Sequence, residues 1–192
     1  MTSQVRRVAT LELVPDRNAR RVLAAAVFVV LTALGAHVEV PLLPVPITLQ
    51  TMFVVLSGIL LGPWLGAASQ LAYLGAGLAG APVFAVVPGL PALVGPTAGY
   101  LLAFPAAALL AGWIAGPAGN RGLVGALRLT AGAMVASFAI LASGAAWLAL
   151  TALSPERALA LGLVPFLPGD VLKTLLAVLI AWRIRPRTLG RL

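Results

Sequence analysis

This sequence has no cysteine, one histidine and few charged side chains, and each shortage excludes a class of protein. The absence of cysteine excludes disulfide scaffolds, thiolate metal sites and cysteine nucleophiles. The single histidine, His37, excludes a histidine-rich metal site. Charged residues make up 9% of the chain, whereas soluble domains average about 25%. Because so little polar material cannot cover a water-facing surface, we expect the chain to fold in lipid.

Long apolar runs dominate the sequence. The 192 residues are 61% hydrophobic, and the mean hydropathy is +1.06. A membrane-spanning helix needs roughly 20 mostly apolar residues, so six spans with short loops would use nearly the whole chain. Apolar runs and proline or glycine punctuation predict an all-α bundle of six transmembrane helices. The predicted spans are residues 21–37, 47–61, 64–79, 96–114, 126–152 and 165–182.

The segments between the spans have their own signals. Three prolines exclude a regular helix over residues 38–46, and residues 80–95 are expected to form a long uncharged loop. Ser154 is predicted to cap a short helix that begins at Pro155. The first apolar run, residues 22–36, is expected to be a retained span rather than a cleaved signal peptide.

The predicted organisation is a single transmembrane domain with cytoplasmic ends. Residues 1–20 form a cytoplasmic N-terminal segment, residues 21–183 form the six-helix domain, and residues 184–192 form a basic cytoplasmic tail. The chain is therefore expected to be a multi-pass protein of the cell inner (plasma) membrane, in contact with the lipid bilayer.

The distribution of basic residues predicts the orientation, because cytoplasmic loops carry an excess of lysine and arginine. With both termini in the cytoplasm, Arg157 lies outside and Lys173 lies in the last span. The other 11 of the 13 basic residues lie inside: Arg6, Arg7, Arg17, Arg20, Arg21, Arg121, Arg128, Arg183, Arg185, Arg187 and Arg191. A net charge of +8 would suggest nucleic acid in a soluble protein, but this distribution favours orientation in the bilayer, and no nucleic-acid partner is expected.

Small residues recur at helical spacing in two spans. Alanine or glycine stands at every fourth position from 68 to 80 and from 103 to 115. Such stripes allow close helix packing or the docking of a partner helix, and they also arise by chance in an alanine-rich chain. Gln70, near the middle of the third span, is expected to join helices rather than to line a pocket.

The strongest local signal is the pair Asp170 and Lys173. The two residues are three apart, so they share a helix face within contact distance. A charge inside a span costs roughly 2.5–3.5 kcal/mol and usually faces a cavity or another charge. Lys173 is also the only lysine, against 12 arginines. The pair is interpreted as a ligand anchor at the floor of an outward-facing cavity; the alternative is an ion pair that only neutralises itself.

Other candidate residues gather at the outer ends of the spans. The polar residues Thr48, Gln50 and Thr51 either line a cavity or cap the second span. Three aromatic residues near the third and fourth spans either pack on the ring of a ligand or anchor the membrane interface: Phe84, Tyr100 and Phe104.

The sequence gives little support for the hypothesis that the chain is an enzyme. Residues 169–174 distantly resemble a phosphate-binding loop, but the glycine before Lys173 and the preceding strand are absent. His37 is not accompanied by a catalytic serine or by a set of metal ligands. No catalytic residue, cofactor or metal is therefore expected.

Five blocks of the sequence carry a resemblance to a known family. They are residues 46–51 (PITLQT), 61–67 (LGPWLGA), 73–75 with 80–84 (YLG and GAPVF), 95–101 (GPTAGYL) and 165–173 (PFLPGDVLK). In this order, the blocks closely resemble the BioY family, the biotin-specific substrate-binding (S) subunits of energy-coupling-factor (ECF) transporters. The likeness extends over roughly residues 20–183.

The resemblance implies six helices and a biotin pocket near the extracellular side, covered by loops. It implies three partner chains, a transmembrane coupling subunit and two cytoplasmic ATPases. By the same resemblance, Asp170 and Lys173 match a polar pair that would contact biotin. Tyr100, Phe84 and the segment 48–51, with Thr48 and Gln50, match pocket or lid blocks.

One feature departs from the family pattern. Binding subunits of this class often carry Ala-x-x-x-Ala in the first span, where the coupling subunit docks. The nearest small pair here is Thr32 and Ala36, which leaves the docking surface open.

The leading hypothesis is a subunit that captures biotin from outside while partner ATPases drive uptake. The alternative is a biotin facilitator that works alone or as a homo-oligomer, without ATPase partners. An intramembrane enzyme or an assembly factor is a third possibility.

Overall fold

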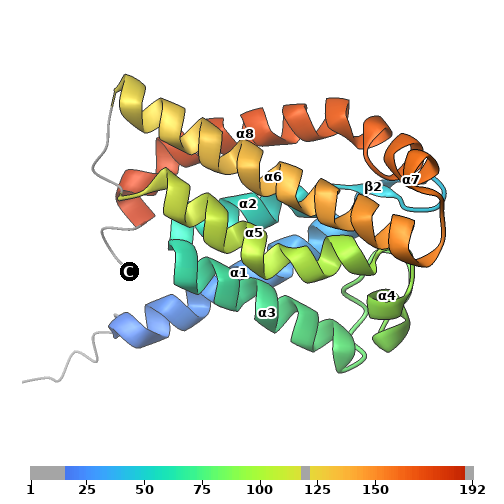
Figure 1. Cartoon of the computed structure of the whole chain (residues 1–192). Helices are drawn as coiled ribbons and strands as arrows, with labels where there is room; N and C mark the ends of the chain where they lie inside the picture. Colours follow the sequence, from blue (N-terminus) through green and yellow to red (C-terminus); the bar gives the residue numbers. More distant parts are fainter. Residues whose placement is uncertain (1–15, 118–121, 189–192) are drawn as a thin grey trace, which may run out of the picture.

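The computed structural model describes residues 16–117 and 122–188, and its long helices form one bundle (Figure 1). A 3-10 turn, η1 (Val164–Phe166), leads into the last helix, and two short strands, β1 (Glu39–Val40) and β2 (Ile47–Thr48), pair antiparallel. The helices are α1 (Arg17–Ala36), α2 (Gln50–Leu61), α3 (Pro63–Leu78), α4 (Leu90–Val94), α5 (Ala98–Ala115), α6 (Leu123–Thr151), α7 (Pro155–Gly162) and α8 (Leu167–Thr188).

Membrane-spanning character is clearest in four parts of the described chain. The helices α1, α5 and α6, and the stretch Pro155–Arg185 that includes most of α8, are long and apolar enough to cross a bilayer. Each of the six predicted spans coincides with a helix: α1, α2, α3, α5, α6 and α8. Four of the basic residues used to predict orientation lie outside the described residues: Arg6, Arg7, Arg121 and Arg191.

The loops match their predictions in part. Residues 38–46 are not helical, and Ser154 caps α7 by accepting a hydrogen bond from the Arg157 backbone N–H at 3.4 Å. The second helix begins at Gln50 rather than at residue 47, because residues 47–48 pair with residues 39–40 as strands. The loop expected over residues 80–95 contains α4, and α8 continues through the start of the predicted tail.

The centre of the bundle is α2. Its 12 residues span only about 18 Å, and it packs against α1, α3, α5, α6 and α8. A side chain at Gly58 would overlap the backbone of Ala108 on α5, and side chains at Gly66 on α3 and Gly112 on α5 would overlap the backbone around Gly58. Without glycine at these contacts, the three backbones could not approach so closely.

The two small-residue stripes have different surroundings. In the stripe from 103 to 115, Ala107, Ala111 and Ala115 are buried, so this stripe packs helices inside the bundle. In the stripe from 68 to 80, Ala68 and Ala72 are exposed on the outside of α3.

Polar side chains join α1, α2 and α3 in the interior. The Gln70 amide donates to Ser57 Oγ at 3.2 Å and to Thr32 Oγ1 at 3.4 Å. The expectation that Gln70 joins helices is therefore confirmed. Thr32 and Ala36 are both fully buried, so this pair does not lie on the outer face of α1.

Arg185 lies in the segment predicted to be a basic cytoplasmic tail, but its side chain is buried against the end of the bundle. The residue is 4% exposed, and its guanidinium donates to three backbone carbonyls at the ends of α2 and α5: Ile59 at 3.0 Å, Ala115 at 3.2 Å and Gly116. Helix C-termini leave carbonyls without intrahelical partners and attract positive charge. Arg185 therefore caps two helices at once.

The N-terminal end of α1 and the C-terminal end of α8 lie at the same end of the bundle, on the left of Figure 1. The strand β2 and the short helices α4 and α7 lie at the opposite end. The candidate site is built between these loop elements and the long helices.

Candidate functional site

The site begins with an ion pair inside the first turns of α8. Lys173 Nζ lies 2.6 Å from Asp170 Oδ1, as their spacing of three residues predicts. Lys173 also donates to the Thr48 carbonyl at 3.1 Å and to Thr51 Oγ1 at 2.7 Å. All three ammonium protons therefore have acceptors, and the lysine links α8 to the start of α2.

The carboxylate of Asp170 is equally well held. Thr51 Oγ1 donates to Oδ1 at 3.1 Å, and Ser137 Oγ on α6 donates to Oδ2. Asp170 and Lys173 are 4% and 6% exposed. A charge pair this buried is tolerated only when its remaining donors and acceptors are satisfied, which is the case here.

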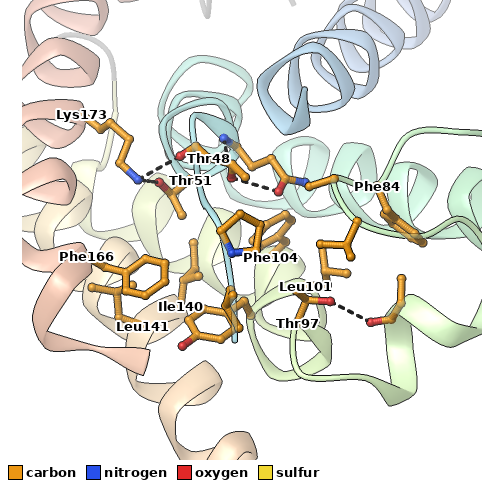
Figure 2. Close-up of a pocket in the computed structure, with 17 residues that line it drawn as sticks. Thr48, Thr51, Phe84, Thr97, Leu101, Phe104, Ile140, Leu141, Phe166 and Lys173 are labelled. Carbon is orange, nitrogen blue, oxygen red and sulfur yellow. Dashed lines mark hydrogen bonds between the residues drawn. The ribbon is translucent and has the colours of Figure 1, made fainter. Parts of the chain in front are cut away.

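Beside the ion pair lies a cavity with an empty volume of about 540 Å³, counting the part that opens to solvent. Sites for small molecules are mostly apolar with a few placed polar groups, and the residues around this cavity have that character. Figure 2 shows the Lys173 side chain reaching toward Thr48 and Thr51 at one end of this cavity. The walls come from β2 and α2, the segment before α4, and α5, α6, η1 and α8.

One wall of the cavity is polar. Thr48 Oγ1 donates to Gln50 Oε1 at 3.0 Å, and Gln50 Nε2 donates to the Tyr73 hydroxyl at 2.6 Å. That hydroxyl donates onward to the Val83 carbonyl at 2.8 Å. These bonds tie the start of α2 through α3 to the loop that carries Phe84.

The other walls are aromatic and aliphatic. Tyr100 and Phe166 stack with centroids 5.8 Å apart, and the Tyr100 hydroxyl donates to the Gly162 carbonyl at the end of α7. Phe84 and Phe104 both pack against Tyr73, with centroids 5.5 Å and 6.2 Å from its ring. A flat, partly apolar ring could pack between these groups.

The structure brings most of the sequence-predicted site residues to this one cavity. Five of the six line it: Lys173, Tyr100, Phe84, Thr48 and Gln50. The sixth, Asp170, does not line the cavity and reaches it through the ion pair with Lys173.

Asp170 faces a second hollow between α6 and α8, with an empty volume of about 530 Å³ when the part open to solvent is counted. The side chains around it include Met134, Phe138, Val171 and Leu175, all about half exposed. This groove therefore opens sideways from the bundle, and its wall has fewer polar groups than that of the first cavity. The first cavity is the candidate ligand site.

Sequence reasoning missed several residues of the site. Ser137, Ile140 and Leu141 of α6 touch the ion pair or the cavity, and Tyr73 supports its polar wall. A helix that is apolar on all sides has no amphipathic stripe to indicate its inward face, so nothing in the sequence distinguishes these positions from their neighbours.

Comparison with known proteins gives consistent matches. The sequence profile of the BioY family matches residues 4–189. A protein named probable biotin transporter BioY, from Pyrococcus horikoshii, is 41% identical over 172 residues, which cover 89% of this chain and 99% of that protein. The biotin transporter BioY of Thermotoga maritima is 36% identical over 168 residues, covering 86% of this chain and 96% of that protein.

A solved structure is also similar. The crystal structure of the S-component for biotin from an ECF-type ABC transporter aligns with a TM-score of 0.80 at 26% identity. The alignment covers 89% of this chain and 93% of that one. Since the family profile matches nearly the whole sequence and the relatives align over most of their length, this chain belongs to the BioY family.

Proposed function

We propose that this chain is the biotin-binding membrane subunit of an ECF-type importer, a transport protein rather than an enzyme. The observation that carries the proposal is a buried ion pair beside an apolar cavity with aromatic walls, in a member of the BioY family. The named relatives are biotin transporters, and the similar solved structure is an S-component for biotin.

The cavity suits the chemistry of biotin. Biotin has a ureido ring with two N–H donors and a carbonyl, an apolar thiolane ring, and a valerate carboxylate. The rings would pack among Phe84, Tyr100 and Phe104, and the polar atoms would meet Gln50 and Lys173. A mostly apolar site with a few placed polar groups is typical for such a ligand.

Within the ion pair, we assign the direct ligand contact to Lys173. Its side chain lines the cavity, whereas Asp170 accepts hydrogen bonds from Ser137, Thr51 and Lys173 itself. Asp170 is the positioning partner that holds the ammonium in place. This differs from the expectation, implied by the family resemblance, that Asp170 and Lys173 would both contact biotin.

Energy for uptake would come from partners, namely a transmembrane coupling subunit and two ATPases. Residues 169–174 lack the glycine that a phosphate-binding loop needs before its lysine. The chain would therefore bind the vitamin while the partners hydrolyse ATP.

In the plasma membrane, the bundle would cross six times with both ends in the cytoplasm. Arg17, Arg20 and Arg183 lie at the bundle end opposite to β2, α4 and α7, and the positive-inside rule assigns that end to the cytoplasm. The cavity then opens to the outside. The short α2 and α3 would cross because a bundle interior and local bilayer thinning accommodate short spans.

Titration of the purified chain with biotin, by calorimetry in detergent, tests the ligand assignment. Thiamine and riboflavin serve as control vitamins. We expect saturable binding of biotin and none of the controls. Equal binding of all three vitamins, or of none, would contradict the proposal.

Reconstitution in liposomes tests the need for partners. We expect the chain alone to bind biotin without accumulating it, and uptake to require the coupling subunit, the ATPases and ATP. Biotin flux through the chain alone would instead support the facilitator.

The absence of native cysteine makes the orientation easy to test. Leu43 is 91% exposed in the loop between the strands, and Leu123 is 76% exposed at the start of α6, at the other end of the bundle. In intact cells, a membrane-impermeant maleimide should label Leu43→Cys and leave Leu123→Cys unlabelled until the cells are opened. The opposite pattern would invert the orientation.

A further inference from the structure

Tyr73 on α3 lies directly behind the cavity wall, with 0% of its surface exposed. Its ring meets Phe84 edge-on, at an interplanar angle of 78°, and stacks on Phe104 at 29°. Its hydroxyl lies between the Gln50 amide and the Val83 carbonyl. Tyr73 does not line the cavity, but it contacts three residues that do: Phe84, Phe104 and Gln50.

The donor and acceptor roles around Tyr73 are determined by chemistry. The Val83 carbonyl can only accept, so the single Tyr73 proton goes to it at 2.8 Å. The hydroxyl oxygen must then accept from Gln50, which requires the amide nitrogen to face Tyr73 at 2.6 Å. At the other end of the amide, the Thr48 hydroxyl donates to Gln50 Oε1 at 3.0 Å. The Gln50 amide therefore has one orientation, although glutamine oxygen and nitrogen are otherwise easily exchanged.

After these bonds, Gln50 retains one amide N–H and one lone pair of its carbonyl oxygen. The Lys173 ammonium has all three protons engaged, by Asp170, Thr48 and Thr51, so it meets a ligand oxygen only by exchanging one of these bonds. An amide offers a donor and an acceptor side by side, and a cyclic urea offers the complementary pair. An amide held in one orientation can form two parallel hydrogen bonds with a ureido N–H and C=O, and a freely rotating amide would lose entropy on doing so.

We infer that Tyr73 is a positioning residue for ligand selectivity: it holds the Gln50 amide in the one orientation that pairs with a ureido ring, and it ties that amide to the loop carrying Phe84. The inference rests on the proposed function, since it deepens the account of the same cavity. Tyr73 acts on the ligand through Gln50, with the Val83 carbonyl fixing the direction of its hydroxyl proton, and does not touch the ligand itself.

The first test is the biotin affinity of Tyr73→Phe. The substitution keeps the ring that packs on Phe84 and Phe104 but removes both hydrogen bonds of the hydroxyl. We expect binding about tenfold weaker, because the Gln50 amide loses the bond that fixes its orientation. Ser143→Ala is the matched control, since it also removes a hydroxyl that donates to a carbonyl, that of Gly99, at 2.8 Å. Its affinity should stay within about twofold of wild type.

A double-mutant cycle separates positioning from general support of the fold. In a Gln50→Met background, Tyr73→Phe should cause no further loss of affinity, because the amide that it orients is gone. A biotin analogue methylated on a ureido nitrogen should likewise bind Tyr73→Phe and wild type equally. An equal loss from Tyr73→Phe in both backgrounds would overturn the inference.

A second variant covers the case in which Tyr73→Phe does not fold. Thr48→Val removes the donor at the other end of the Gln50 amide and should show the same non-additivity with Gln50→Met. If wild-type protein binds biotin and both Tyr73→Phe and Thr48→Val bind it unchanged, the positioning role is refuted while the proposed function stands. If the wild type itself does not bind biotin, both are refuted.

Discussion

Removing one charge of the buried ion pair should cost stability, and removing both should cost only function. Asp170→Asn leaves the Lys173 ammonium buried without its counter-charge, which lies 2.6 Å away in the wild type. Breaking a buried pair from one side typically costs about 3–5 kcal/mol. The hydrogen bonds of Lys173 to Thr48 and Thr51 remain, so we expect a loss of about 3 kcal/mol, at the lower end of that range.

The double variant Asp170→Leu with Lys173→Met removes both charges, and its expected effect on the free energy of unfolding is the opposite of that of Asp170→Asn. Replacing a buried pair by apolar side chains of similar volume is often neutral or stabilising by about 1–4 kcal/mol. We therefore expect the double variant to be at least as stable as wild type and to bind no biotin. That combination would mean that the charges are kept for the ligand and not for the fold.

Thermal unfolding in detergent, followed by tryptophan fluorescence, measures the change in stability of each variant. For a chain of this length, 1 kcal/mol corresponds to a Tm shift of about 2–4 °C, so Asp170→Asn should melt roughly 6–12 °C lower. Glu156→Gln is the control, because Glu156 is exposed on α7, and it should change stability by no more than about 0.5 kcal/mol. Wild-type biotin affinity in the double variant would refute the assignment of the pair as a ligand anchor.

Three further predictions follow from individual contacts. Arg185→Ala should lower the Tm, because hydrogen bonds to charged groups contribute about 1.5–3 kcal/mol, yet leave biotin affinity in calorimetry unchanged; weaker binding would contradict a purely capping role. Gly58→Ala should prevent a stable fold, as judged by size-exclusion chromatography, because its Cβ overlaps the neighbouring backbone, whereas Gly75→Ala, with nothing within 4 Å of its Cβ, should be neutral. Ser137→Ala should weaken biotin binding about tenfold, because it removes a donor to the Asp170 carboxylate; unchanged affinity would mean that this carboxylate needs no support from α6.

Most helices of this protein were predicted from the sequence, and the segments that connect them were predicted in part. Apolar length and proline positions placed the long helices to within a few residues. The β1–β2 pair was not predicted, because two-residue strands need a partner segment whose position the local sequence does not reveal. The short helix α4 was missed for a related reason: five residues are too few to show a helical period.

The candidate site was predicted unevenly. Lys173 was identifiable because a lone lysine in an apolar span is rare and costly. Its role relative to Asp170 was not identifiable, since spacing places both residues on one helix face but does not say which of them faces the cavity. Ser137 carried no signal, and Tyr73 stood in a block of the family resemblance without a role, because a hydroxyl among apolar residues indicates neither its partner nor its direction.

Composition by itself indicated that the chain belongs in lipid, the charge distribution predicted which way it should face, and ordered motifs indicated its family. These properties depend on local hydropathy and on short blocks, and neither requires a packed structure. Only the packed structure shows that Arg185, in the predicted tail, is buried and caps two helices. It also shows that Lys173 rather than Asp170 lines the cavity. The physical reason is that helices apolar on every side have no amphipathic preference, so their rotation is set only by where glycine, alanine and buried polar groups let neighbouring backbones meet.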